Sequence, residues 1–168
     1  MSSVSPPAGG ILSFHPMNGV GIQNGVFMKW VTWEQVGVDR MACAWLITTY
    51  LDQEAEFLFV PAGQKPMPEG AEPFDIPGVR LSHHRGHCTF YTMLREYGLH
   101  DPVLQRIARV VDEADTVQEV SLEPVAAGLD LICRGIRITS PSDQVALERG
   151  HLIYDALYAQ FASEPTEE

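Results

Sequence analysis

The order of apolar and polar residues between positions 29 and 62 predicts a strand, a helix and a second strand. Residues 29–33, KWVTW, combine aromatic and β-branched side chains, as strands do. Residues 39–52, DRMACAWLITTYLD, are apolar almost all round and predict a buried helix with Asp39 as its N-cap. Residues 55–62, AEFLFVPA, are apolar on both faces, as in a central parallel strand. This succession predicts a βαβ unit.

The next segment predicts a loop, a third strand and a helix. Residues 63–73 are rich in proline and glycine, which favours a loop. Residues 79–84, VRLSHH, predict a strand, and residues 88–98, CTFYTMLREYG, predict a helix that ends at Gly98. The strand-to-helix turn between them is rich in histidine.

The C-terminal half of the sequence follows helical spacing. Asp101, followed by a proline, is a cap for residues 101–115, whose apolar side chains recur every three or four positions. Residues 123–136 predict another helix, and residues 140–162 predict the last one, capped by Ser140.

These elements predict an α/β fold with a small, mostly parallel sheet of three or four strands, begun by the βαβ unit, and a helix-rich C-terminal half. We expect one domain over residues 28–162. The leader, residues 1–27, shows no sustained period and is expected to be disordered, and residues 163–168 are expected to fray.

Charge and cysteine content narrow the function classes. The 168-residue chain has a formal net charge of −11, which argues against a broad nucleic-acid or anionic-membrane surface but leaves room for one small positive pocket. Three cysteines without a secretory signal predict a reducing cytoplasm rather than a disulfide framework. No apolar run reaches the length of about 20 residues that a membrane helix needs. A homodimer is left open.

Four potential metal ligands lie within six residues, at His83, His84, His87 and Cys88. Imidazole and thiolate groups bind zinc and other divalent transition metals, so the cluster predicts a metal or anion site, although its spacing matches no standard zinc finger. Side chains alternate between the faces of a strand, so His83 and His84 face one pocket only if the strand breaks between them.

Carboxylates elsewhere can complete such a site. Asp39 and Arg40 lie at a βα turn, where open α/β sheets bind ligands. In the helix that ends near residue 115, Asp112 is expected to point into solvent, whereas Asp115 or Glu113 can reach a site at the edge of the core.

Three blocks of sequence resemble the C-terminal domain of the chromate-resistance ChrB family: VGVDRMACAWLITTYLDQEAEFLFVPA, FDIPGVRLSHHRGHCTFYTMLREYGLHDPVLQRIARVVDEAD and EPVAAGLDLICRGI. The resemblance spans residues 29 to 160 and implies a role in chromate resistance, where full-length members are described as chromate-sensing regulators. The matching motif positions are Asp39, Arg40, Cys43, Trp45, His83, His84, Cys88 and Asp115. Full-length regulators carry a further N-terminal region thought to bind DNA; this sequence shows no helix-turn-helix and no basic stripe, so direct nucleic-acid binding is not expected.

A second likeness, to DHH phosphoesterases, rests on residue order. Asp39, Asp75, the SHH triplet at 82–84 and Asp115 occur in the order of that family's metal motifs, with Ser82 where the triplet has an aspartate. The likeness implies divalent ions held by Asp and His, and the serine removes one metal-bridging carboxylate.

Three functions follow as hypotheses. The first is a cytoplasmic sensor or accessory domain that binds a metal ion or an oxyanion such as chromate; the second is a DHH-like metal-dependent phosphoesterase; the third is a thiol redox protein using Cys88 and Cys43. A divalent transition metal (zinc, manganese or iron) requires a negatively charged site and an oxyanion a positively charged one, and the sequence does not distinguish between them. We predict as metal ligands Asp39, His83, His84 and Asp115, and as groups that bind an accompanying ligand Arg40, Arg85 and Cys88.

Overall fold

The sheet is small and entirely parallel. The computed structural model describes residues 22–23, 26–27, 29–116 and 120–164. The central strand β3 (Lys29–Trp33) pairs on one side with β4 (Glu56–Val60) and on the other with β5 (Ala71–Pro73). Two short strands, β1 (Ile22–Gln23) and β2 (Val26–Phe27), form a separate antiparallel pair. The α/β class and the opening βαβ unit are confirmed.

The third strand is not where the sequence pattern placed it. It is β5, inside the segment predicted as a loop, while residues 79–84 contribute only two isolated bridges, Phe74 with Leu81 and His84 with His87. A strand of three residues is too short to show a hydrophobic period in the sequence. Its position depends instead on pairing with β3, where the Val31 carbonyl accepts the N–H of Phe74, the residue after β5, at 3.0 Å.

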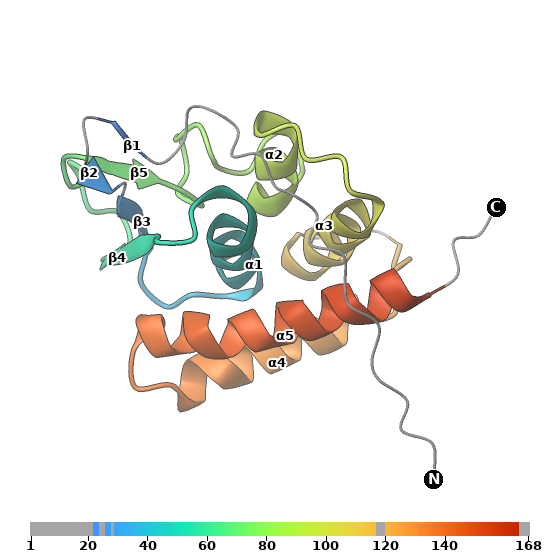
Figure 1. Ribbon diagram of the computed structural model, residues 1–168. Helices are drawn as coiled ribbons and strands as arrows, with labels where there is room; N and C mark the ends of the chain where they lie inside the picture. The colour runs from blue at the N-terminus through green and yellow to red at the C-terminus, as the bar shows by residue number, and fades with distance from the viewer. Residues whose placement is uncertain (1–21, 24–25, 28, 117–119, 165–168) are drawn as a thin grey trace, which may run out of the picture.

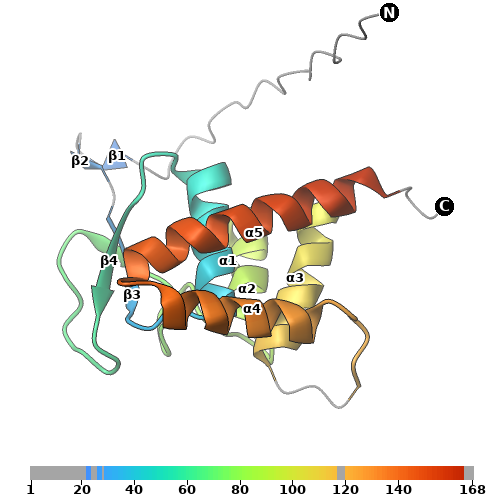
Figure 2. The same ribbon diagram turned by 90° about the horizontal axis from the view of Figure 1, so that it is seen from below.

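Five α-helices pack around the sheet edge and on one another (Figure 1). They are α1 (Val38–Leu46), which continues into a π-helical turn, η1 (Ile47–Leu51), then α2 (Thr89–Glu96), α3 (Pro102–Asp115), α4 (Ala126–Thr139) and α5 (Asp143–Ser163). Figure 2 shows α4 and α5 side by side, crossing over α1, α2 and α3. The helix-rich C-terminal half is therefore an outer layer that closes the domain.

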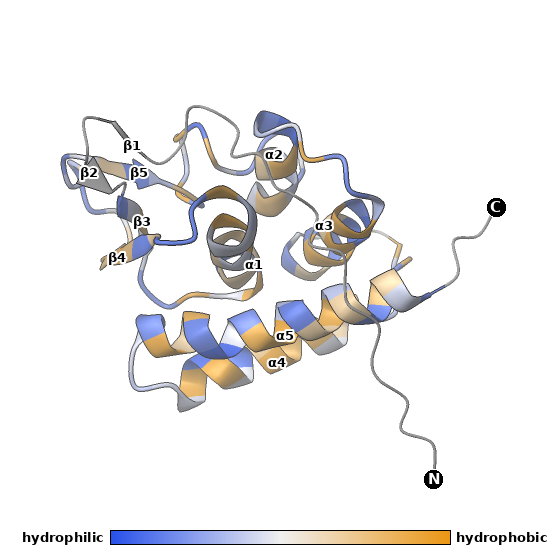
Figure 3. Ribbon diagram, in the orientation of Figure 1, coloured by the Kyte–Doolittle hydropathy of each residue, from blue (hydrophilic) through white to orange (hydrophobic). Residues whose placement is uncertain are grey.

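Helix α1 is the centre of the core. Its buried face includes Trp45, whose ring stacks on Phe90 at 6.4 Å and on Tyr154 at 5.9 Å between ring centroids. Figure 3 shows apolar residues along both α4 and α5. Those that are buried, Leu129, Leu147 and Tyr154 among them, belong to the same hydrophobic cluster as the buried residues of α1. Burial of this aromatic cluster fixes α1 against α2 and α5.

The caps explain where the helices begin. Asp101 caps α3 as expected, accepting the Val103 N–H at 2.7 Å. The last helix begins at Asp143 and is capped by Ser142, whereas Ser140, the predicted cap, follows the last residue of α4. Asp39 is not the cap of α1, because the helix begins one residue earlier, after Gly37.

No helix in the described ranges combines the length and the apolar character of a membrane span. Most of the predicted leader and residues 165–168 lie outside the described residues, so the domain limits stay predictions.

Candidate metal centre

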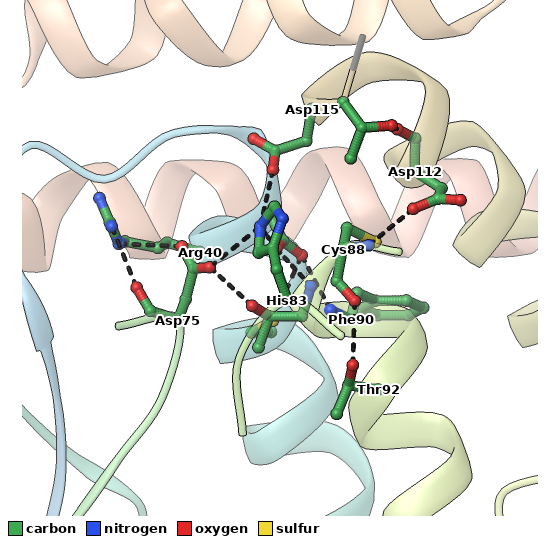
Figure 4. Close-up of polar contacts among 12 residues, drawn as sticks. Arg40, Asp75, His83, Cys88, Phe90, Thr92, Asp112 and Asp115 are labelled. Carbon is green, nitrogen blue, oxygen red and sulfur yellow. Dashed lines mark hydrogen bonds and ion pairs between the residues drawn. The ribbon is translucent and has the colours of Figure 1, made fainter. Parts of the chain in front are cut away.

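His83 lies at the centre of three carboxylates at the carboxyl edge of the sheet. Its Nε2 atom is 3.1 Å from an oxygen of Asp115, 3.3 Å from Asp39 and 3.4 Å from Asp75. Figure 4 shows the imidazole between Asp115, at the end of α3, and Asp75, which follows β5. Elements far apart in the sequence thus deliver four side chains to one point.

Asp39 belongs to α1 but caps α2. Its two carboxylate oxygens accept the backbone N–H groups of Thr89 at 2.7 Å and Phe90 at 2.9 Å. The N-cap residue of α2, Cys88, makes no side-chain cap among the described residues, so Asp39 takes this role from another helix. The positive end of the α2 dipole stabilises the buried carboxylate there.

Asp75 is held in an uncommon backbone conformation. Its φ angle of +50° is in the left-handed region, which costs free energy for a residue with a Cβ. Thr89 Oγ1 donates to its carboxylate at 2.6 Å, and Arg40 Nε lies 3.0 Å from its other oxygen. These partners orient Asp75 toward His83.

The last turn of α3 faces the histidine-rich turn with two Asp–His pairs. Asp115 pairs with His83, and one turn earlier Asp112 contacts His87 Nδ1 at 2.8 Å and accepts the Cys88 N–H at 2.6 Å. The expectation that Asp112 points into solvent is wrong. The buried stripe of α3 is centred on Leu104, Ala108 and Val111, and positions 112 and 115 continue it.

The cluster perturbs its own ionisation. Burial, followed by the negative charge of Asp75, raises the pKa of Asp39 to about 6. Hydrogen bonds to Asp115, Asp39 and Asp75 raise the pKa of His83 to about 12. At neutral pH the imidazole is therefore a cation among carboxylates, which shows that this point favours positive charge.

Three donor atoms suit a metal ion. One atom each of Asp39, His83 and Asp115 lie within 4.8 Å of one another, a separation compatible with metal–ligand bonds of about 2.0–2.2 Å. Three protein ligands leave coordination positions open for water or another molecule, as in sites that bind a ligand on the metal.

The other predicted site residues lie apart from this point. His84 is exposed, and its Nε2 lies 3.0 Å from the Arg80 carbonyl, so the structure does not bring it into the cluster. Arg85 is exposed in the same turn, with a φ angle of +54°. Arg40 joins the cluster through Asp75, whereas the Cys88 N–H donates to Asp112, which lies outside the cluster.

Both candidate redox thiols are buried. Burial, together with the negative charge of Asp39, raises the pKa of the Cys43 and Cys88 thiols. A thiol that resists ionisation and is closed to solvent is a poor nucleophile and a poor redox group.

Asp75 was absent from the predicted ligand set. Ligands in parallel α/β sheets bind beyond the carboxyl ends of strands, and Asp75 lies two residues after β5. The DHH likeness already names Asp75, and recognising the third strand at 71–73 would have added a positional reason to include it.

A cavity of about 790 Å³ opens at the metal centre. The cluster residues Asp39, Asp75, His83 and Asp115 line it, together with side chains of β3, of the turn after β5 and of α4. A molecule inside it can therefore reach the open positions of a bound metal ion.

Comparison with known proteins decides the family. The family model described as "ChrB, C-terminal domain" matches residues 30–161, nearly all of the folded domain. The chain belongs to this family. Over 138 residues the ChrB domain is 32% identical to Protein ChrB of Cupriavidus metallidurans. That match covers 80% of this chain and 41% of the relative, so the ChrB domain spans about two-fifths of the relative's length. No solved structure shows a significant match.

Proposed function

We propose that this ChrB domain binds one divalent transition-metal ion through Asp39, His83 and Asp115, as a sensor or accessory protein of chromate resistance. The observation that carries the proposal is the position of His83 Nε2, 3.1–3.4 Å from oxygens of three separate carboxylates. Two carboxylates and one imidazole form a donor set that favours Mn²⁺ or Fe²⁺. Zinc, by contrast, often occupies softer sites that contain thiolates.

The charges around His83 favour a cation over a chromate dianion that binds without a metal ion. The carboxylates of Asp39, Asp75 and Asp115 repel a dianion, and Arg40, the cation beside them, is already paired with Asp75. A divalent ion that displaces the His83 proton leaves the local charges near balance. An anion can then bind on the metal rather than in its place.

Metal content tests the proposal directly. Protein prepared without a histidine tag, loaded with Mn²⁺ or Fe²⁺ and desalted, is expected to retain about one ion per chain by elemental analysis. Zinc is the comparison ion. The absence of any retained ion after loading with all three metals would contradict the proposal.

Metal affinity is expected to rise with pH. In the metal-free protein His83 holds its proton up to a pKa of about 12, so the metal must displace that proton at neutral pH. Affinity for Mn²⁺ should therefore increase by up to about tenfold per pH unit between pH 6 and 8, with release of about one proton. Calorimetric titration in two buffers of different ionisation enthalpy measures the proton count. An affinity that is constant over this range would mean that His83 is not a ligand.

A metal-dependent hydrolase is the second candidate. Asp39, Asp75, His83 and Asp115, the residues that share their order with the metal motifs of DHH phosphoesterases, surround one point. The Ser82 hydroxyl donates to the Val79 carbonyl at 2.7 Å rather than supplying a bridging carboxylate. Release of phosphate from a phosphoester by the Mn²⁺-loaded protein, abolished by chelator, distinguishes this candidate from simple binding.

A further inference from the structure

Helix α4 brings positive charge to the cavity that contains the metal centre. Asp130, Arg134 and Arg137 are spaced by four and three residues, so they lie on one face of the helix, and all three line the cavity. Arg134 is paired with Asp130. Arg137, which is half-buried, forms no hydrogen bond or ion pair with any residue that the structure describes.

The Arg137 guanidinium has no partner among the described residues, so its donors are available to a ligand that enters the cavity. Arginine presents five N–H donors in a planar fork that matches phosphate and carboxylate oxygens. Three guanidinium groups line the cavity, those of Arg40, Arg134 and Arg137, and a divalent ion at the proposed site adds positive charge beside its carboxylates. The metal-loaded cavity therefore favours an anion, although the whole chain is acidic.

The same cavity has an apolar part. Trp33, Ile76 and Pro77 line it, and Arg40 lies over the Trp33 ring at 5.8 Å. The indole Nε1 of Trp33 is buried and has no hydrogen-bond partner among the described residues. Buried donors are nearly always satisfied, so this one points to a missing acceptor.

The cavity has room for a ligand larger than a bare oxyanion. A tetrahedral oxyanion fills roughly the space of three or four water molecules, about 100 Å³. The cavity of about 790 Å³ is within the usual range for organic ligands, about 300–1,000 Å³.

We propose that the cavity binds an organic phosphate monoester. Its phosphate bridges the open positions of the metal ion and the guanidinium of Arg137, and its organic part lies against Trp33, Ile76 and Pro77. This inference rests on the proposed metal site and adds the class of ligand. A dianionic phosphate suits this cavity better than a carboxylate, because its three terminal oxygens can contact both the ion and the arginine.

Calorimetric titration of the Mn²⁺-loaded protein tests the inference. The probes are adenosine 5′-monophosphate and phenyl phosphate, compared with adenosine, inorganic phosphate and chromate. At least one of the two monoesters is expected to bind tenfold or more tightly than inorganic phosphate and chromate. That binding should weaken at least tenfold without metal, and adenosine should show no dependence on metal.

Variants separate this inference from the metal site. Arg137→Ala is expected to weaken monoester binding tenfold or more while leaving the Mn²⁺ dissociation constant within about threefold, because Arg137 contacts no metal ligand. Arg95→Ala, which removes an exposed arginine of α2, is the matched control and should change neither. Three outcomes with normal Mn²⁺ binding overturn the ligand class alone. They are no monoester binding, monoester binding no tighter than that of inorganic phosphate or chromate, and monoester binding that Arg137→Ala leaves unchanged. Failure of Mn²⁺ to bind overturns the metal site and, with it, the bridging geometry.

Discussion

Replacing His83 by alanine is expected to raise the dissociation constant for Mn²⁺ by about 100-fold. His83 Nε2 is the only nitrogen donor of the described three-residue cluster and the atom that all three carboxylates approach. Structural metal sites are worth about 10–16 kcal/mol over four ligands, so one ligand contributes about 3 kcal/mol, or about 100-fold in affinity. Competition of the protein with a fluorescent chelator for Mn²⁺ measures the change.

His84→Ala is the matched control for this experiment. The two histidines are adjacent and both exposed, yet His84 contacts the Arg80 carbonyl instead of the carboxylates. The control is expected to bind Mn²⁺ like the unaltered protein. Equal loss of metal from both variants would mean that the turn is rearranged, and equal retention would place the ligands elsewhere.

Replacing Asp39 by alanine is expected to cost both metal binding and stability. Its carboxylate accepts two backbone N–H groups at the start of α2, in a region closed to solvent. Buried donors left unsatisfied cost about 1–3 kcal/mol each, and relief of the repulsion from Asp75 and Asp115 offsets part of this. The free energy of unfolding of the metal-free protein should fall by about 2–3 kcal/mol, measured by urea denaturation.

Asp115→Ala separates metal binding from the stability of the metal-free protein. Asp115 is 27% exposed and lies at the C-terminal end of α3, where the helix dipole disfavours a carboxylate. Its removal is expected to abolish tight Mn²⁺ binding while changing the free energy of unfolding of the metal-free protein by less than about 1 kcal/mol. If Asp39→Ala were as stable as Asp115→Ala, the cap of α2 by Asp39 would be energetically unimportant.

The proposed metal ligands differed in how far local sequence could identify them. Asp39 was predicted from its position at a βα turn, Asp115 from its place beside the apolar stripe of its helix, and His83 from the density of ligand-type residues in one turn. His84 was included from the same density of ligand-type residues, although alternation along a strand would turn it away from His83; the chain there makes a turn closed by hydrogen bonds between His84 and His87. The backbone of that turn, which local pattern does not specify, decides which histidine faces the carboxylates.

The sequence by itself determined the α/β class, the βαβ opening, the helical C-terminal half and the Asp101 cap of α3. These features depend on period and on residues within a few positions of one another, such as Asp101 and the start of α3. Only the tertiary structure decided that Asp39 caps α2, that Asp112 faces His87, that β5 is the third strand, and that Arg137 shares a cavity with the metal centre. Each of these contacts joins residues 24 or more positions apart or from different elements, so each depends on how the elements pack, which the local pattern of side chains does not encode.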